Sequence, residues 1–261
     1  MTRLPIYQVD AFTEHLFRGN PAAVIPLTAW LPEATMRAIA AENNMPATAF
    51  FCRDGDAYAI RWFTPDAELP LCGHGTLASG YVVLRLLEPS LPRVAFRTRS
   101  GTELGIARDG EALAMSLPSD PAASCAMPAG LVEALGAAPR ATFATQRTLA
   151  VFDDPREVIG LAPDFAALRR LGRGVIVTAP GDEGYDCVSR VFVPAPGIDE
   201  DAVTGSAHCT IIPYWTGRLG KPNLKAHQAS PRGGELACSL DGERVTLVGH
   251  ARLYLEGTIS I

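Results

Sequence analysis

Arg61-Trp62-Phe63-Thr64-Pro65 and Arg190-Val191-Phe192-Val193-Pro194 share the pattern R-x-F-x-P, 129 positions apart. After each copy a glycine, Gly73 or Gly205, begins a stretch with the apolar spacing of a helix. The offset is close to half of the 261 residues, so the repeat predicts two similar halves. The alternative is a chance likeness between residues that are common in strands.

The composition is that of an ordinary globular chain. Hydrophobic residues make up 48% and charged residues 20%, which excludes a disordered, collagen-like or coiled-coil protein. The formal net charge of −5 without a basic patch argues against a nucleic-acid partner. Apolar runs such as residues 81–84 are far shorter than the roughly 20 residues of a membrane span, so we expect no membrane partner. We find no signal peptide and expect a cytoplasmic protein.

The pattern of apolar residues predicts alternating strands and helices in both halves. Strands are expected at residues 6–10, 22–25, 48–52, 58–63, 94–98, 102–107, 113–117, 148–152, 175–179, 187–193, 235–239, 244–248 and 252–255. Helices are expected at residues 32–44, 73–87, 131–135 and 165–171, and from residue 205 onward. The stretch 118–128 is rich in Pro, Ala and Ser and is the expected linker between halves 1–117 and 129–261, although the first or last strand could cross over.

The two glycine-opened helix starts carry most of the chemistry-bearing residues. The first is Cys72-Gly73-His74-Gly75-Thr76, and the second runs from Asp201 to His208. A helix start presents free N–H groups and a partial positive charge, and glycine lets a ligand approach the backbone. Two such starts facing each other would hold a small carboxylate and stabilise an enolate-like charge while nearby ionisable groups move protons. The alternative is that both are simple N-caps.

Cysteine and histidine spacing argues against a metal site. The six cysteines form no CxxC pair and the five histidines form no HxxxH or HExxH pattern, so we expect no metal. Scattered thiols in a chain of this size indicate reduced, mostly buried apolar residues, with Cys72 as the exception.

The motifs together resemble the PhzF (phenazine biosynthesis-like) family from end to end. The resemblance rests on the following stretches: residues 7–12 and 18–24, Arg61 to Pro65 with Glu68, residues 72–76, residues 201–208, Pro213-Tyr214-Trp215, Gln228 and Arg232-Gly233-Gly234. It implies an α+β protein of the diaminopimelate epimerase fold, with two pseudo-symmetric halves, each a curved and mostly antiparallel sheet around a central helix. It also implies a cleft between the halves that takes a small acid, no cofactor, a role in secondary metabolism, and a homodimer.

The resemblance assigns site residues, with one departure from the family pattern. It maps His74 and Asp201 onto catalytic positions. The expected substrate-binding residues are Asn20, Ala47, Gly73, Gly75, Thr76, Gly205 and Ser206. The family's proton-carrying glutamate lies in a segment like N-x-S-E-T-A-F, and here Ala47 occupies its place in residues 44–50. Alanine cannot transfer a proton.

Three side chains remain as proton carriers: Asp201 if burial raises its pKa, His74, and Cys72 before a helix start. Glu42 is expected to face solvent, and Glu68 is as readily an ion-pair partner of an arginine. Epimerases of this fold use one cysteine from each half, but the counterpart of Cys72 lies near Thr204, which disfavours a two-thiol racemase.

These residues predict a cofactor-independent isomerase of a small carboxylic acid in which Asp201 and His74 transfer protons. A lyase, dehydratase or cyclase at the same cleft is the second hypothesis. The third is a catalytically silent binding protein that keeps the two helix starts.

Overall fold

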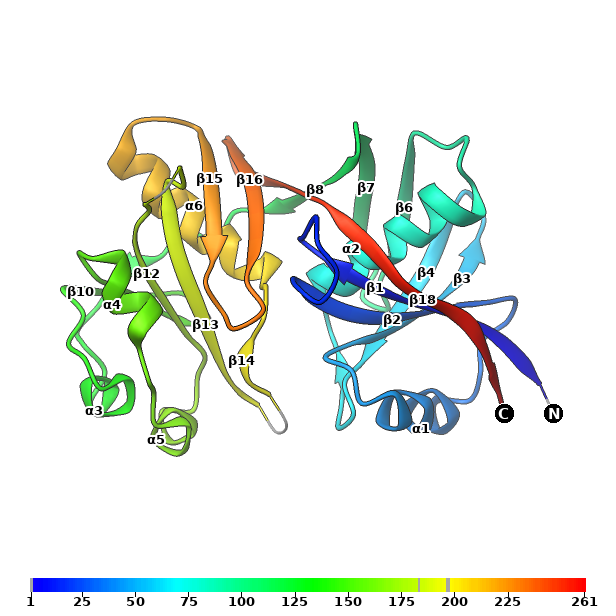
Figure 1. Cartoon of the computed structure of the whole chain (residues 1–261), viewed down its shortest axis with the longest axis horizontal. Helices are drawn as coiled ribbons and strands as arrows, with labels where there is room; N and C mark the ends of the chain where they lie inside the picture. Colours follow the sequence, from blue (N-terminus) through cyan, green and yellow to red (C-terminus); the bar gives the residue numbers. More distant parts are fainter. Residues whose placement is uncertain (1, 183, 196–197) are drawn as a thin grey trace. The chain divides into compact units, whose positions relative to one another are not determined.

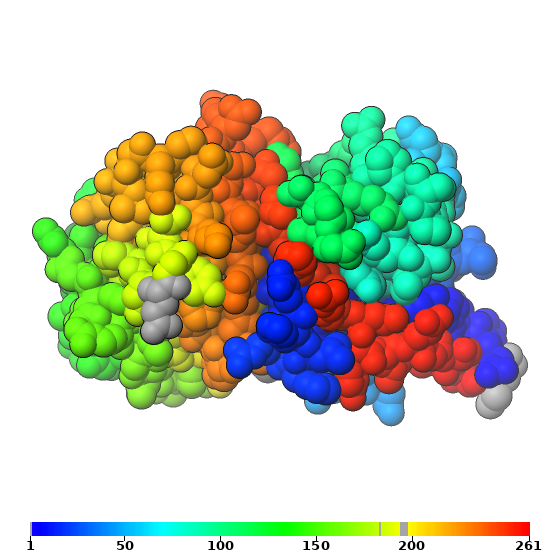
Figure 2. All heavy atoms as spheres, turned by 45° about the horizontal axis from the view of Figure 1, so that its top comes forward, coloured from blue at the N-terminus to red at the C-terminus, as the bar shows by residue number. Residues whose placement is uncertain are grey.

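The computed structural model describes residues 2–182, 184–195 and 198–261, which divide into two compact units (Figure 1). The first unit comprises Met1–Ser116 and Val248–Ile261, and the second comprises Leu117–Leu247. The C-terminal strand β18 belongs to the first unit because it pairs with β1 along its length, and the two segments lie side by side on the surface (Figure 2).

Among the described residues, the first unit holds nine strands, the end of a tenth and three helical segments. Its elements are β1 (Arg3–Ala11), β2 (Asn20–Leu27), α1 (Glu33–Asn43), β3 (Thr48–Asp54), β4 (Ala57–Phe63), β5 (Glu68–Leu69), α2 (Gly73–Tyr81), the π-helical turn η1 (Val82–Leu87), β6 (Arg93–Arg97), β7 (Glu103–Asp109), β8 (Ala112–Pro118), β18 (Ala251–Ser260) and the last residues of β17. The helix predicted over 73–87 is therefore α2 followed by the wider turn η1.

The second unit repeats this alternation and adds short surface helices. Its elements are β9 (Ala123–Ser124), α3 (Leu131–Leu135), β10 (Ala141–Ala144), β11 (Thr148–Val151), α4 (Pro155–Gly160), α5 (Phe165–Arg170), β12 (Val175–Pro180), β13 (Cys187–Ala195), β14 (Ile198–Asp201), α6 (Gly205–Leu219), β15 (Asn223–Gln228), β16 (Gly234–Asp241) and most of β17 (Arg244–Gly249). Within the stretch 118–128, β9 pairs with β10.

The two units share one order of strand pairing. In the first, β2 and β3 are parallel, β3 and β5 each pair antiparallel with β4, β4 and β6 are parallel, and β6 and β7 are antiparallel. In the second, β11 to β16 repeat this series strand for strand. The predicted α+β architecture of two pseudo-symmetric halves, each with a mostly antiparallel sheet, is confirmed.

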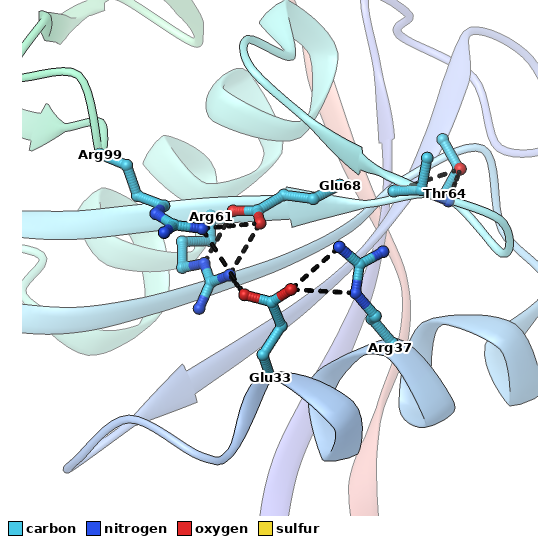
Figure 3. A network of polar contacts seen from close by, with 7 residues as sticks. Glu33, Arg37, Arg61, Thr64, Glu68 and Arg99 are labelled. Carbon is cyan, nitrogen blue, oxygen red and sulfur yellow. Dashed lines mark hydrogen bonds and ion pairs between the residues drawn. The ribbon is translucent and has the colours of Figure 1, made fainter.

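The repeated R-x-F pattern forms an equivalent ion pair in each unit. In the first, Nε and Nη2 of Arg61 each donate at 2.8 Å to the carboxylate of Glu68, which stands opposite Phe63 (Figure 3). In the second, Arg190 donates at 2.7 and 2.8 Å to Glu200, which stands opposite Phe192. Each guanidinium also lies 5.1 Å from the phenylalanine ring two residues on. The sequence repeat is therefore a structural repeat that connects a strand to the start of the following helix.

The helix of each repeat lies against its own sheet. Residues 74–80 of α2 are buried on every side, and α2 packs on β1, β2, β3 and β7. In the second unit α6 packs on β15 and β16. Pro213 inside α6 has no N–H to give to the carbonyl of Cys209, and that carbonyl accepts instead from the backbone N–H of Asp120 at 2.9 Å.

The outer helices cover the opposite faces of the sheets. In the first unit, α1 buries Met36 and Ile39 against Phe50 and Phe63. In the second, α3, α4 and α5 supply a cluster that reaches Phe192. Each unit thus has a sheet between a central helix and an outer layer, and this packing holds the start of the central helix in place within its own unit.

Candidate active site

The start of α2 gathers three of the expected site residues. The side chain of Asn20, at the first residue of β2, places Nδ2 3.1 Å from Nδ1 of His74. With the amide nitrogen facing Nδ1, Asn20 donates, and the neutral imidazole carries its proton on Nε2. The Sγ atom of Cys72 lies 3.6 Å from Nδ1 and 3.8 Å from Nε2 of the same ring. A thiol and an imidazole therefore lie in contact at the N-terminus of a buried helix.

Thr76 and Gly75 contribute to the local structure of α2. The Thr76 hydroxyl donates at 2.6 Å to the carbonyl of Cys72, one turn back, so it is already used inside the helix. A side chain at Gly75 would meet Cδ1 of Trp62 at 2.8 Å and Sγ of Cys72 at 3.1 Å. The missing side chain of Gly75 thus makes room for the buried indole of Trp62.

We expect Gly75→Ala to lower the free energy of unfolding by about 1–3 kcal/mol, because the new methyl group overlaps a rigid, buried indole ring. The matched control is Gly217→Ala in α6, where a methyl group meets nothing within 4 Å. There the smaller backbone entropy loss should stabilise the protein by about 0.5–1 kcal/mol. Urea unfolding measures both, and equal effects of the two substitutions would contradict the packing argument.

The position of the absent glutamate lies beside β2. Ala47 is fully buried just before β3, and its carbonyl accepts from the backbone N–H of Ala23 at 2.9 Å. Glu42 is exposed on α1, as predicted. Glu68 is held by Arg61 and Arg99, and the hydrogen bonds from Arg61 keep the pKa of Glu68 below its usual value. In the contacts described, neither Glu42 nor Glu68 substitutes for the glutamate that is absent at position 47.

The start of α6 carries a carboxylate fixed by its neighbours. Thr204 Oγ1 donates at 2.7 Å to Oδ2 of the half-buried Asp201. The buried Gln228 accepts from the backbone N–H of Thr204 at 2.8 Å and donates to the backbone carbonyl of Asp201 at 2.7 Å. Gln228 therefore holds the turn between β14 and α6, a role that its place in the C-terminal motif did not disclose.

The first turn of α6 also holds Gly205 and Ser206. Gly205 is buried, and Ser206 is half-buried. Nη2 of Arg147 lies 3.2 Å from Oγ of Ser206. Arg147 was missed by the sequence analysis because no motif contains it, and it comes to this helix start through the turn between β10 and β11.

The matched topology shows that the chemistry of the two helix starts differs. Trp62 pairs with Leu69 as Val191 pairs with Asp201, so the carboxylate of one unit corresponds to an apolar residue in the other. The N-cap positions are Cys72 in α2 and Thr204 in α6. One start offers a thiol and an imidazole, and the other offers a carboxylate.

His208 occupies the position in α6 that Thr76 has in α2, and it likewise caps the carbonyl at its N-cap. Its Nδ1 lies 2.9 Å from the carbonyl of Thr204 and must donate to it. The ring is fully buried, and this desolvation lowers the pKa of His208 to about 4. His208 is therefore a neutral structural side chain near neutral pH.

The buried His208 is expected to make the protein acid-sensitive. Below pH 6.5 His208 is protonated in the unfolded chain, whereas in the folded protein it stays neutral down to about pH 4. The folded protein therefore loses stability as the pH falls through this range. We expect a loss of up to about 1.4 kcal/mol per pH unit in this window. Urea unfolding of the unaltered protein and of His208→Gln between pH 7 and pH 4 tests this. A stability difference between the two proteins that does not change with pH would contradict it.

The other cysteines behave as buried apolar residues, as predicted. Cys52, Cys187, Cys209 and Cys238 are buried, Cys125 is half-buried, and burial raises the pKa of Cys187 and of Cys209 to about 12. Among the described residues, no group of three or more His, Cys, Asp and Glu side chains could ligate a metal. Within the same residues, every helix is too short or too polar to cross a membrane.

Comparison with known proteins places this geometry in a family. An "uncharacterized isomerase" of Pseudomonas aeruginosa is 50% identical over 260 residues and spans 99% of both chains. The crystal structure of a PhzF-family phenazine biosynthesis protein from Enterococcus faecalis is 41% identical, covers 100% of both chains and superposes with a TM-score of 0.96. A hydroxyproline epimerase from Agrobacterium vitis, 13% identical, covers 98% of this chain and 92% of its own at a TM-score of 0.61, and so shares the fold alone.

The predicted diaminopimelate epimerase fold is thereby confirmed. The family model described as "phenazine biosynthesis-like protein" matches residues 9–257. The match covers both helix starts, and the chain belongs to the phenazine biosynthesis-like PhzC–PhzF family.

Proposed function

We propose that the protein is an isomerase of a small carboxylic acid that moves a proton by acid–base catalysis, with the residues at the starts of α2 and α6 as its catalytic groups. The observation that carries the proposal is that the repeated helix start holds a different ionisable group in each unit, an imidazole and a thiol at α2 and a carboxylate at α6. Relatives over the full chain length are named isomerases, which supports the reaction class.

Asp201 and His74 are the proposed proton carriers in place of the absent glutamate. The hydrogen bond from Thr204 holds the Asp201 carboxylate in position, and a positioned carboxylate can act as a general base. The His74 ring is fixed by Asn20, which favours one tautomer and one orientation. One group removes a proton from carbon and the other returns a proton to a second carbon, while the helix starts stabilise the enolate-like charge.

Cys72 is the third candidate, and its contact with His74 supports a role. A thiol beside an imidazole at a helix start is more readily ionised than a thiol in an apolar core. With a single thiol the site could eliminate water instead of shifting a proton, so a lyase or cyclase is the second candidate function.

Solvent exchange tests the proposal directly. Purified protein is incubated in deuterated water with a panel of small unsaturated and hydroxylated carboxylic acids, and the products are followed by NMR and mass spectrometry. Deuterium that enters carbon without loss of water supports the isomerase. Loss of water supports the lyase, and a new ring supports the cyclase. Tight binding without any exchange contradicts an enzymatic role and supports a silent binding protein.

A further inference from the structure

Arg147 holds a guanidinium at a fixed place beside the first turn of α6. It is half-buried, and its Nη2 donates to Oγ of Ser206 at 3.2 Å. A side chain at Gly174 would stand 3.3 Å from both Cγ and Cδ of Arg147, so the aliphatic part of the arginine packs on bare backbone. This packing reduces the entropy that the side chain would lose on binding a ligand.

The charge of Arg147 has no counter-ion within the described residues. Two other arginines of the same unit, Arg140 and Arg169, form ion pairs with Asp153 and Asp199, whereas none of the described carboxylates lies within 4.0 Å of Arg147. A cation beside the N-terminus of a helix is also repelled by the positive end of the helix dipole. A half-buried arginine at a helix N-terminus is electrostatically unfavourable unless an anion is bound beside it.

The first turn of α6 beside Arg147 presents several hydrogen-bond donors. Because Oγ of Ser206 accepts from Arg147, the hydroxyl hydrogen is directed to another acceptor. The backbone N–H of Thr204 is taken by Gln228, whereas those of Gly205 and Ser206 have no acceptor among the described residues. A guanidinium, a hydroxyl hydrogen and backbone N–H groups form a set that matches the lone pairs of a carboxylate.

We propose that Arg147 is a specificity-determining residue that binds a carboxylate of the substrate. By its hydrogen bond to Ser206, Arg147 also orients the Ser206 hydroxyl, which donates to the same carboxylate. This inference rests on the proposed function, because it assigns the anionic group of that substrate to the α6 side. It predicts that the protein distinguishes an acid from the neutral amide of the same shape.

Binding of malonate and of its diamide, malonamide, tests the inference by calorimetry without any turnover. The unaltered protein should bind malonate about tenfold or more tightly than malonamide, as expected for a charge-assisted hydrogen bond. Arg147→Gln should remove this preference by weakening malonate alone, and Arg147→Lys should keep part of it. The matched control is Arg173→Gln, since Arg173 donates to the backbone carbonyl of Thr145 in the same turn. The control should bind both probes like the unaltered protein.

Equal malonate affinity of Arg147→Gln and the unaltered protein, or no malonate preference in the unaltered protein, would overturn the inference. With any acid that exchanges deuterium, Arg147→Gln should raise KM by about tenfold or more and leave kcat nearly unchanged. If malonate binding depends on Arg147 but no acid in the panel takes up deuterium from solvent, the proposed isomerase is wrong and the anion-binding role of Arg147 is still supported.

Discussion

Asp201→Asn and His74→Ala should each lower the rate of deuterium exchange about 10²- to 10⁴-fold, the range for a general acid or base. This corresponds to about 2.7–5.4 kcal/mol of transition-state stabilisation. The asparagine keeps the shape of Asp201 and can still accept from Thr204 Oγ1, but it cannot take a proton. Because the geometry is kept, the loss should fall on kcat and leave substrate binding nearly unchanged.

Asp199→Asn is the matched control for Asp201. Asp199 lies on the same short strand, β14, and forms an exposed ion pair with Arg169. Its loss should leave the rate within about twofold, as expected for a surface ion pair. If Asp201→Asn and His74→Ala both keep full turnover, neither residue is an acid–base group and the site assignment fails. If only Cys72→Ser abolishes turnover, the single-thiol reaction replaces the proposed one.

The sequence predicted the architecture well because the decisive signals are local. Apolar runs located most strands, and the glycines at 73 and 205 do begin α2 and α6. The strands that escaped prediction are short or polar. In β15, Asn223, Lys225 and His227 alternate with buried residues, so only one face of the strand is apolar. The strand β14 has only four residues, all of them half-buried and three of them acidic. Their places are set by pairing with β13, which no local pattern encodes.

The site was predicted only where motifs carry it. His74 and Asp201 stand in recognisable motifs, whereas the contacts that fix them come from distant segments. Asn20 reaches His74 from 54 positions away, and Arg147 reaches Ser206 from 59. Such contacts depend on the order in which the strands pair, so no regular spacing of residues in the sequence indicates them. The homodimer implied by the resemblance stays a prediction.

The equivalent ion pairs of the two units should differ sharply in their contribution to stability. The side chains of Arg190 and Glu200 are 9% and 11% exposed, and Nη1 of Arg190 also donates to the carbonyl of Leu161 at 2.7 Å, just beyond α4. Removing Arg190 leaves a nearly buried carboxylate and a helix end without their donor. We therefore expect Arg190→Met to lower the free energy of unfolding by about 3–5 kcal/mol.

Arg61→Met is the matched comparison, because the same pair in the first unit has a second cation. Glu68 keeps an ion pair with Arg99 at 3.1 Å when Arg61 is removed, so its charge is not left alone (Figure 3). The loss should therefore be clearly smaller, about 1–2 kcal/mol, the cost of lost hydrogen bonds without a stranded charge. Urea unfolding at neutral pH measures both variants. The double variant Arg190→Met/Glu200→Leu should regain much of the stability, since no buried charge then lacks a partner. Equal losses for Arg61→Met and Arg190→Met, or no recovery in the double variant, would show that packing rather than the stranded carboxylate sets the cost.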